Sequence, residues 1–141
     1  MLKQIIINNV IAVIIHTVFC CFSYFLLSFI MRYEGSLFTS VLFVIVAIAI
    51  PILYVLCGRL FLRNTNNITN NVLSVTIVAI VLIVLMFMSM NDGHLMIANY
   101  SFVPIAVYTI RFLPTFIAVL IFALLPSITL YIGMITKKLG G

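Results

Sequence analysis

The residues best placed to do chemistry lie on one face of a long apolar stretch near the N-terminus. Asn9, His16, Cys20 and Ser23 follow one another at spacings of seven, four and three residues. These spacings put all four side chains on one face of an α-helix. Of the acidic residues and histidines, His16 alone lies deep within such a stretch. Ionisable groups inside a membrane are costly and often functional, so the stripe indicates a polar pathway or a contact with another helix.

A structural interpretation of the same stripe is favoured. A neutral imidazole can hydrogen-bond a hydroxyl or carbonyl group of a neighbouring helix and so hold the two helices together. No apolar stretch contains a carboxylate that could accept a proton from His16. His16 and Cys20 could bind a soft metal, but with Cys57 as a doubtful third ligand they fall short of the four that a structural zinc site requires. We therefore expect no metal and no cofactor.

Catalytic motifs are absent from the sequence. It contains no Ser/His/Asp set, no H-E-x-x-H and no glycine-rich phosphate loop. Its two acidic residues, Glu34 and Asp92, stand in separate predicted turns, where a general acid/base pair is not readily formed. We therefore expect no enzymatic activity.

The elements that must position the stripe are four apolar stretches. Each reaches the length of about 20 residues that a helix needs to cross a bilayer: 5–31, 37–62, 72–90 and 112–134. The sequence predicts an all-α integral membrane protein, a bundle of four transmembrane helices arranged as two antiparallel hairpins within a single domain, 1–141. Residues 102–110 are apolar but too short to cross, which predicts an interfacial or re-entrant piece.

The composition excludes an ordinary soluble domain. Hydrophobic residues make up 66% of the chain and charged residues 6%, against about 25% charged in typical soluble domains. A membrane β-barrel is excluded as well, because its strands alternate apolar and polar side chains, whereas 44–50 and 78–84 are apolar throughout. Lipid is therefore the expected solvent.

The basic residues predict the topology. If both termini are cytoplasmic, five of the seven lie inside, which agrees with the positive-inside rule: Lys3, Arg59, Arg63, Lys137 and Lys138. Arg59, Arg63, Lys137 and Lys138 are then expected to contact lipid of the inner leaflet. The net charge of +5 does not indicate nucleic-acid binding, because the basic residues stand singly or in pairs at the ends of the spans.

Two prolines, Arg111 and a run of asparagines each have an interpretation of their own. Pro51 and Pro126 fall inside predicted spans, where proline removes a backbone hydrogen bond and kinks the helix. Arg111 is expected at the outer edge, either extending to lipid headgroups or binding an anionic ligand or a partner's carboxylate. In the polar run 64–71, Asn70 or Asn71 is expected to cap the third span.

Two functional classes remain open. The first is an accessory or interaction subunit, including an immunity-type protein, whose partner is a larger membrane protein or a second copy of the chain. The second is a small oligomeric channel or transporter lined by the stripe of the first span. The expected location is the cell membrane, and the richness in amino acids of the type that AT-rich codons encode, such as Ile, Asn and Phe, is typical of an AT-rich, bacterial genome.

Overall fold

The computed structural model describes residues 2–32, 37–88, 99–105 and 115–137. Helix α1 covers Leu2–Met31 and α2 covers Leu37–Phe61. A short α3, Ile68–Leu73, precedes α4, Thr76–Met88. A 3₁₀ turn, η1, covers Tyr100–Phe102, and α7 covers Thr115–Thr136.

Three of the described helices are long and apolar enough to cross a membrane, judged by length and composition: Leu2–Ile30, Leu37–Phe61 and Ile117–Thr136. A shorter apolar helix covers Thr76–Leu85. All regular elements of the described structure are helical. Their length and apolar composition support the assignment of the chain as a membrane protein, as the apolar stretches predict.

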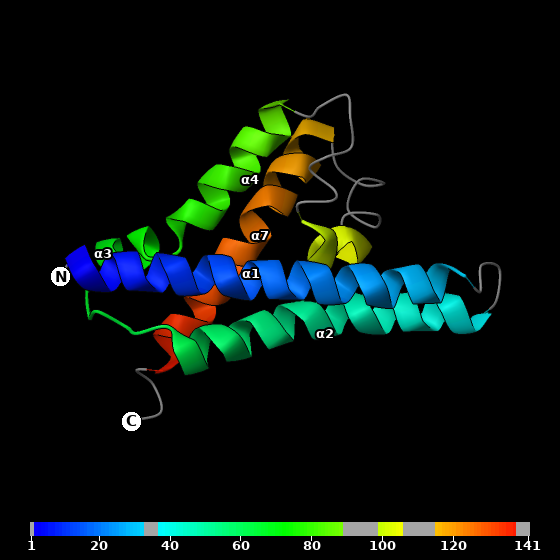
Figure 1. The fold of residues 1–141 in the computed structure, drawn as a ribbon, viewed down its shortest axis with the longest axis horizontal. Helices are drawn as coiled ribbons and strands as arrows, with labels where there is room; N and C mark the ends of the chain where they lie inside the picture. Colours follow the sequence, from blue (N-terminus) through cyan, green and yellow to red (C-terminus); the bar gives the residue numbers. More distant parts are fainter. Residues whose placement is uncertain (1, 33–36, 89–98, 106–114, 138–141) are drawn as a thin grey trace.

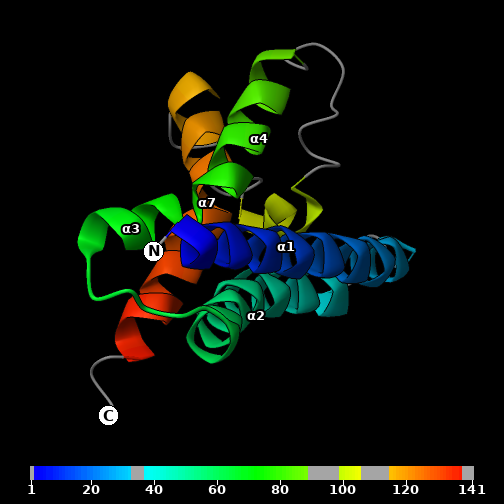
Figure 2. The ribbon, with the colours of Figure 1, turned by 60° about the vertical axis from the view of Figure 1, so that its left-hand side comes forward.

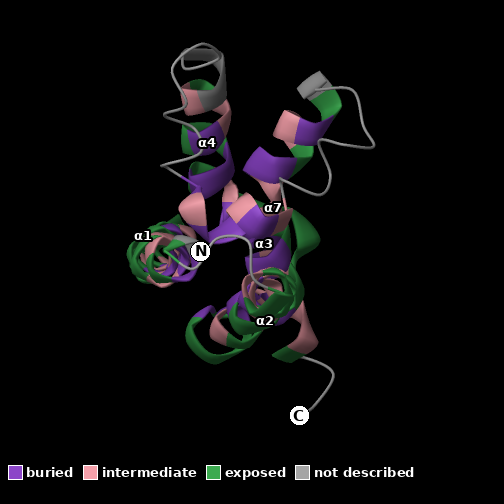
Figure 3. Ribbon diagram, turned by 90° about the vertical axis from the view of Figure 1, so that its right-hand side faces the viewer, coloured by how far each residue is buried: buried purple, intermediate pink, exposed green. Residues whose placement is uncertain are grey.

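The helices are arranged as two pairs. Helices α1 and α2 lie side by side and run in opposite directions, while α4 and α7 form a second pair that is steeply inclined to the first (Figure 1). Seen along α1 and α2, the second pair extends away to one side (Figure 3). The single four-helix bundle expected from the sequence is therefore not confirmed.

The closest approach between the two pairs is the crossing of α2 and α7. Gly58 of α2 lies against the backbone of Leu130, and Gly133 of α7 lies against the backbone of Val55. A Cβ atom on Gly133 would come within 2.8 Å of the Arg59 backbone nitrogen, a distance that would force the two helices apart. The crossing therefore requires glycine on both helices, as small residues often allow in membrane proteins.

The predicted third span is not one continuous helix. A turn at Ser74 and Val75 separates α3 from α4, and α3 lies as a separate short helix beside the start of α1 (Figure 2). The N-cap of α3 is Asn67, whose side chain accepts bonds from the backbone nitrogens of Thr69 and Asn70. The cap expected at Asn70 or Asn71 is therefore wrong: both residues lie inside α3 and are buried.

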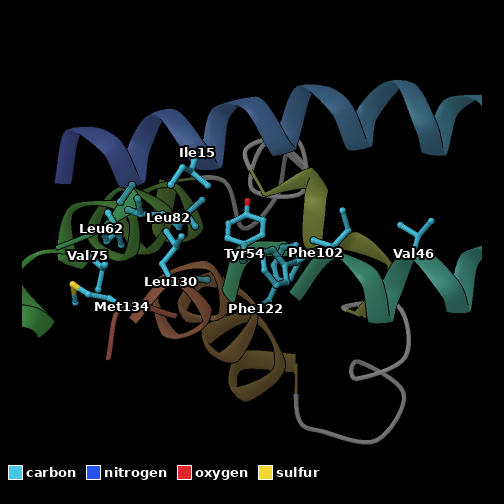
Figure 4. Close-up of a cluster of buried hydrophobic side chains, with 14 of the residues drawn as sticks. Ile15, Val46, Tyr54, Leu62, Val75, Leu82, Phe102, Phe122, Leu130 and Met134 are labelled. Carbon is cyan, nitrogen blue, oxygen red and sulfur yellow. The ribbon is translucent and has the colours of Figure 1, made fainter. Parts of the chain in front are cut away.

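The apolar core forms where the two pairs meet. It takes side chains from every described helix of more than ten residues and from η1 (Figure 4). The largest fully buried side chains are those of Tyr54 and Phe102. In the most apolar window of α7, 50% of residues are buried, against 22% in α1 and in α2, so α7 is the central element of the described structure.

Candidate functional site

The predicted stripe of α1 faces the interior of the molecule. Asn9 and Ser23 are buried, and His16 and Cys20 are half-buried. The four residues do not share one set of partners, however. His16 and Cys20 belong to one hydrogen-bonded group near the middle of α1, and Asn9 belongs to another near its start. The Ser23 hydroxyl is buried and has no hydrogen-bond partner among the described residues.

The group around His16 is a closed ring of four side chains. His16 Nδ1 lies 2.9 Å from the Tyr54 hydroxyl, which lies 3.0 Å from Ser101 Oγ. Ser101 Oγ lies 3.6 Å from Cys20 Sγ, which lies 3.5 Å from His16 Nε2 and so returns to the first residue. Three elements contribute: α1, α2 and η1.

Each member of this ring supplies one donor and one acceptor when the imidazole is neutral. The donors can therefore all point one way around the ring or all point the other way, and both directions satisfy the ring. A protonated imidazole has two donors and no acceptor, so it would break this pattern. The neutral ring fits an apolar interior, where an unpaired polar group is costly.

Aromatic side chains pack against the ring of Tyr54. The rings of Phe19 and Phe102 lie 4.7 Å and 4.9 Å from the Tyr54 ring, measured between centroids. Tyr54 is fully buried, with its hydroxyl directed toward α1 (Figure 4). His16 also borders a small hollow of about 200 Å³ between α1 and α4, whose other lining residues include Val13, Val78 and Leu82.

Sequence reasoning missed Tyr54 and Ser101. A tyrosine three residues after Pro51, in mid-span rather than at the headgroup level where tyrosine is enriched, was the available signal for the first. Ser101 stands just before the segment 102–110, which carried no clear assignment. The structure shows Phe102 as the end of η1 and residues 103–105 as helical; residues 106–110 lie outside the described residues.

Asn9 completes the helix ladder at the break between α3 and α4. In a continuous helix the Ile77 nitrogen would donate to the Leu73 carbonyl. Instead, the Asn9 side chain lies between them: its Nδ2 donates to the Leu73 oxygen at 2.7 Å, and its Oδ1 accepts from the Ile77 nitrogen at 3.1 Å. The break is therefore satisfied by a side chain from α1.

Asn8, which sequence reasoning did not select, has a similar role one residue earlier. Its Oδ1 accepts from the Arg63 nitrogen at 3.2 Å, and its Nδ2 donates to the Arg63 oxygen at 2.9 Å and lies 3.2 Å from Ser74 Oγ. The side chain is fully buried. Asn8 therefore joins the start of α1 to the end of α2 and to the break, and the adjacent amides in an apolar run were the signal for this role.

Pro126 is inside α7 as expected, and the structure shows what compensates for it. Proline has no N–H to donate to the carbonyl four residues earlier, which is that of Phe122. Asn99 Nδ2 donates to this carbonyl at 2.6 Å, while Asn99 Oδ1 is buried and has no hydrogen-bond partner within the part of the chain that the structure describes. Pro51 likewise lies inside α2.

The basic residues at the ends of α2 and α7 occupy different settings. Arg59 and Arg63 are both exposed, as is Lys137. Arg63 and Lys137 line one hollow of about 390 Å³ together with Asn64 and Asn66, whereas Arg59 does not line it. Lys138 and Arg111 lie outside the described residues.

The chemistry open to these groups is hydrogen bonding. Among the described residues, no group of three or more His, Cys, Asp or Glu side chains is placed to hold a metal ion. The three cysteines, all within the described residues, form no disulfide. Comparison with protein families, with curated proteins and with solved structures gives no match, so the interpretation rests on the geometry of this chain.

Proposed function

We propose that this chain is an accessory subunit that binds a larger membrane protein within the bilayer, with both of its termini in the cytoplasm. The polar stripe of α1 supports this role over that of a small channel or transporter. Asn9 is bonded to the break between α3 and α4, and His16 and Cys20 belong to a closed ring. Polar groups used in this way hold helices together instead of lining a path for a solute.

The observation that carries the proposal is a row of exposed phenylalanines on α1. Phe22, Phe25 and Phe29 are 55%, 72% and 56% exposed and follow at spacings of three and four residues. They therefore share one face of the helix. This part of α1 and its neighbour α2 extends beyond α4 and α7 (Figure 1).

Exposed apolar residues alone are ordinary in lipid, but the type and grouping of these three are informative. The aromatic residues that anchor a helix at the headgroup level are chiefly Trp and Tyr, whereas Phe has no polar atom for that position. Large aromatic side chains are enriched in the buried centres of protein interfaces. The Phe22–Phe25–Phe29 face is therefore the proposed contact with the partner.

Site-specific photo-crosslinking in the membranes of the source cell tests this proposal. A benzophenone side chain at Phe25 should yield one discrete protein adduct. The matched control is the same group at Phe61, which is 57% exposed and lies at the other end of the pair, on α2. Lipid adducts alone at both positions, or an adduct only with a second copy of this chain, would contradict the proposal.

A second measurement distinguishes the channel or transporter. Purified protein in liposomes should carry no solute flux. Flux that is lost in folded His16→Leu would favour the alternative, because His16 is a ring member that also borders a hollow.

The proposed topology predicts that a reporter fused after Gly141 is cytoplasmic, and an extracellular reporter would contradict it.

A further inference from the structure

The hollow beside Arg63 joins segments that are far apart in the chain. Arg63 follows the end of α2, Asn64 and Asn66 belong to the link to α3, and Lys137 follows α7. The two cations are thereby brought to one hollow of about 390 Å³. Arg59, one turn earlier on α2, is exposed but does not line it.

These cations have no acidic partner in the segments that form the hollow. The chain has two acidic residues, Glu34 and Asp92, and neither belongs to α2, to the link 62–67 or to α7. Two cations in one hollow repel each other unless an anion lies between them. An anion bound between them would therefore come from outside these segments.

The link that forms the hollow is held in shape by its own hydrogen bonds. Asn64 Oδ1 accepts from the Asn66 nitrogen at 2.9 Å and from Asn71 Nδ2 at 2.8 Å. Asn71 Oδ1 accepts from the Thr65 nitrogen at 2.9 Å, and Asn66 takes the left-handed conformation with φ 59°, which asparagine tolerates. Asn8 holds the backbone of Arg63. The hollow is therefore preorganised for a ligand.

An apolar track continues from this polar hollow. A second hollow of about 350 Å³ shares Asn64 and Asn66 with the first and is also lined by Ile68, Tyr131 and Ile135. A third, of about 370 Å³, shares Tyr131 with the second and follows the groove between α4 and α7. Between Leu124 and Lys137 the track runs roughly 20 Å along α7, from the rise per residue of an α-helix.

We propose that this track binds one anionic phospholipid. Its phosphate lies between Arg63 and Lys137, where a guanidinium can bind two phosphate oxygens at once. One acyl chain passes Tyr131 into the α4–α7 groove. A basic hollow next to a row of apolar hollows matches the two halves of a phospholipid, and basic pockets between membrane helices are known to hold anionic headgroups.

The test measures binding of phosphatidylglycerol to the full-length protein in phosphatidylcholine nanodiscs, for example by native mass spectrometry. The natural protein should bind phosphatidylglycerol in preference to phosphatidylcholine. The double variant R63Q/K137Q should bind it roughly 30-fold more weakly, from the usual contribution of two basic residues near an anionic surface. Arg59→Gln, which removes a neighbouring charge outside the hollow, should weaken binding by no more than about fivefold, the general contribution of a single basic residue near an anionic surface.

A second pair of variants tests the acyl-chain part of the track. Ile128 lines the groove and is 46% exposed, whereas Ile132 is 41% exposed and does not line it. Ile128→Trp should weaken phosphatidylglycerol binding, and Ile132→Trp should not. Both positions are at the surface, so both variants should keep the helical content of the natural protein.

Three outcomes would overturn the proposal. Binding that is unchanged in R63Q/K137Q would remove the head site, and equal losses in R63Q/K137Q and Arg59→Gln would show nonspecific surface attraction. Inorganic phosphate forms the third arm of the test. If millimolar phosphate displaces the lipid completely and Ile128→Trp has no effect, the hollow binds a free phosphate group and the lipid assignment is wrong.

Discussion

At the scale of single residues, the Tyr54 hydroxyl connects two parts of the chain. It lies within hydrogen-bonding distance of His16 on α1 and of Ser101 in η1, and the whole Tyr54 side chain is buried. A polar group in such surroundings is expensive if it is left unpaired. The hydrogen-bonded ring therefore favours this arrangement of α1, α2 and η1 over other arrangements that would bury a similar apolar area.

Tyr54→Phe removes the hydroxyl while keeping the aromatic ring. The free energy of unfolding in detergent should fall by about 1–2 kcal/mol, because interhelical hydrogen bonds in membranes average about 0.6 kcal/mol with a maximum near 1.7 and two are lost. Tyr24→Phe is the matched control, since Tyr24 is 51% exposed and should lose nothing measurable. Equal stability of the two variants would show that the ring contributes nothing.

The sequence predicted part of this site for a physical reason. His16 stands in an apolar run with Cys20 one turn away, and helical periodicity alone puts both on one face. Tyr54 is 38 residues from His16 along the chain, and Ser101 is 81 residues from Cys20. Contacts of that range depend on tertiary packing, which no local spacing encodes.

At the scale of elements, Pro126 and Asn99 act as a pair. Proline withdraws the donor for the Phe122 carbonyl, and Asn99 supplies a replacement from outside the helix. The loss of this backbone hydrogen bond could be predicted from the proline. The identity of the compensating donor could not, because Asn99 belongs to a different segment, 23 residues away from Phe122 in the chain.

A double-mutant cycle measures this coupling. Asn99→Ala in the natural background should lower the free energy of unfolding by about 1–3 kcal/mol, because the buried Phe122 carbonyl is left unpaired. In a Pro126→Ala background the helix supplies its own N–H, so Asn99→Ala should cost less. Additive effects of the two substitutions would show that Asn99 does not compensate for the proline.

At the scale of the whole molecule, Gly58 and Gly133 determine how the two helix pairs cross. Apolar length predicted the long helices well, because lipid requires about 20 apolar residues per span. The crossing was not predicted, because the sequence contains no G-x-x-x-G motif and the two glycines meet only when α2 and α7 pack together. Each glycine lies against the backbone of the other helix.

Gly58→Ala adds one methyl group at this crossing. The free energy of unfolding should fall by about 2 kcal/mol or more, in the range found when a packed core is overfilled, because the new atom would meet the backbone of Leu130. Val44→Ile adds a carbon of similar size at a position 43% exposed on the same helix and should change stability by less than about 0.5 kcal/mol. Equal stability of Gly58→Ala and the natural protein would contradict the close crossing.

The amide of Asn9 has a consequence for biogenesis. It replaces the backbone hydrogen bond that is missing between α3 and α4. During synthesis α1 leaves the ribosome before α3 and α4 do. Because α1 is made earlier than α3 and α4, it can thus act as a template on which they take their bent course. A chain that begins after residue 9 would lack that template and would be free to form the uninterrupted third span that its apolar sequence favours.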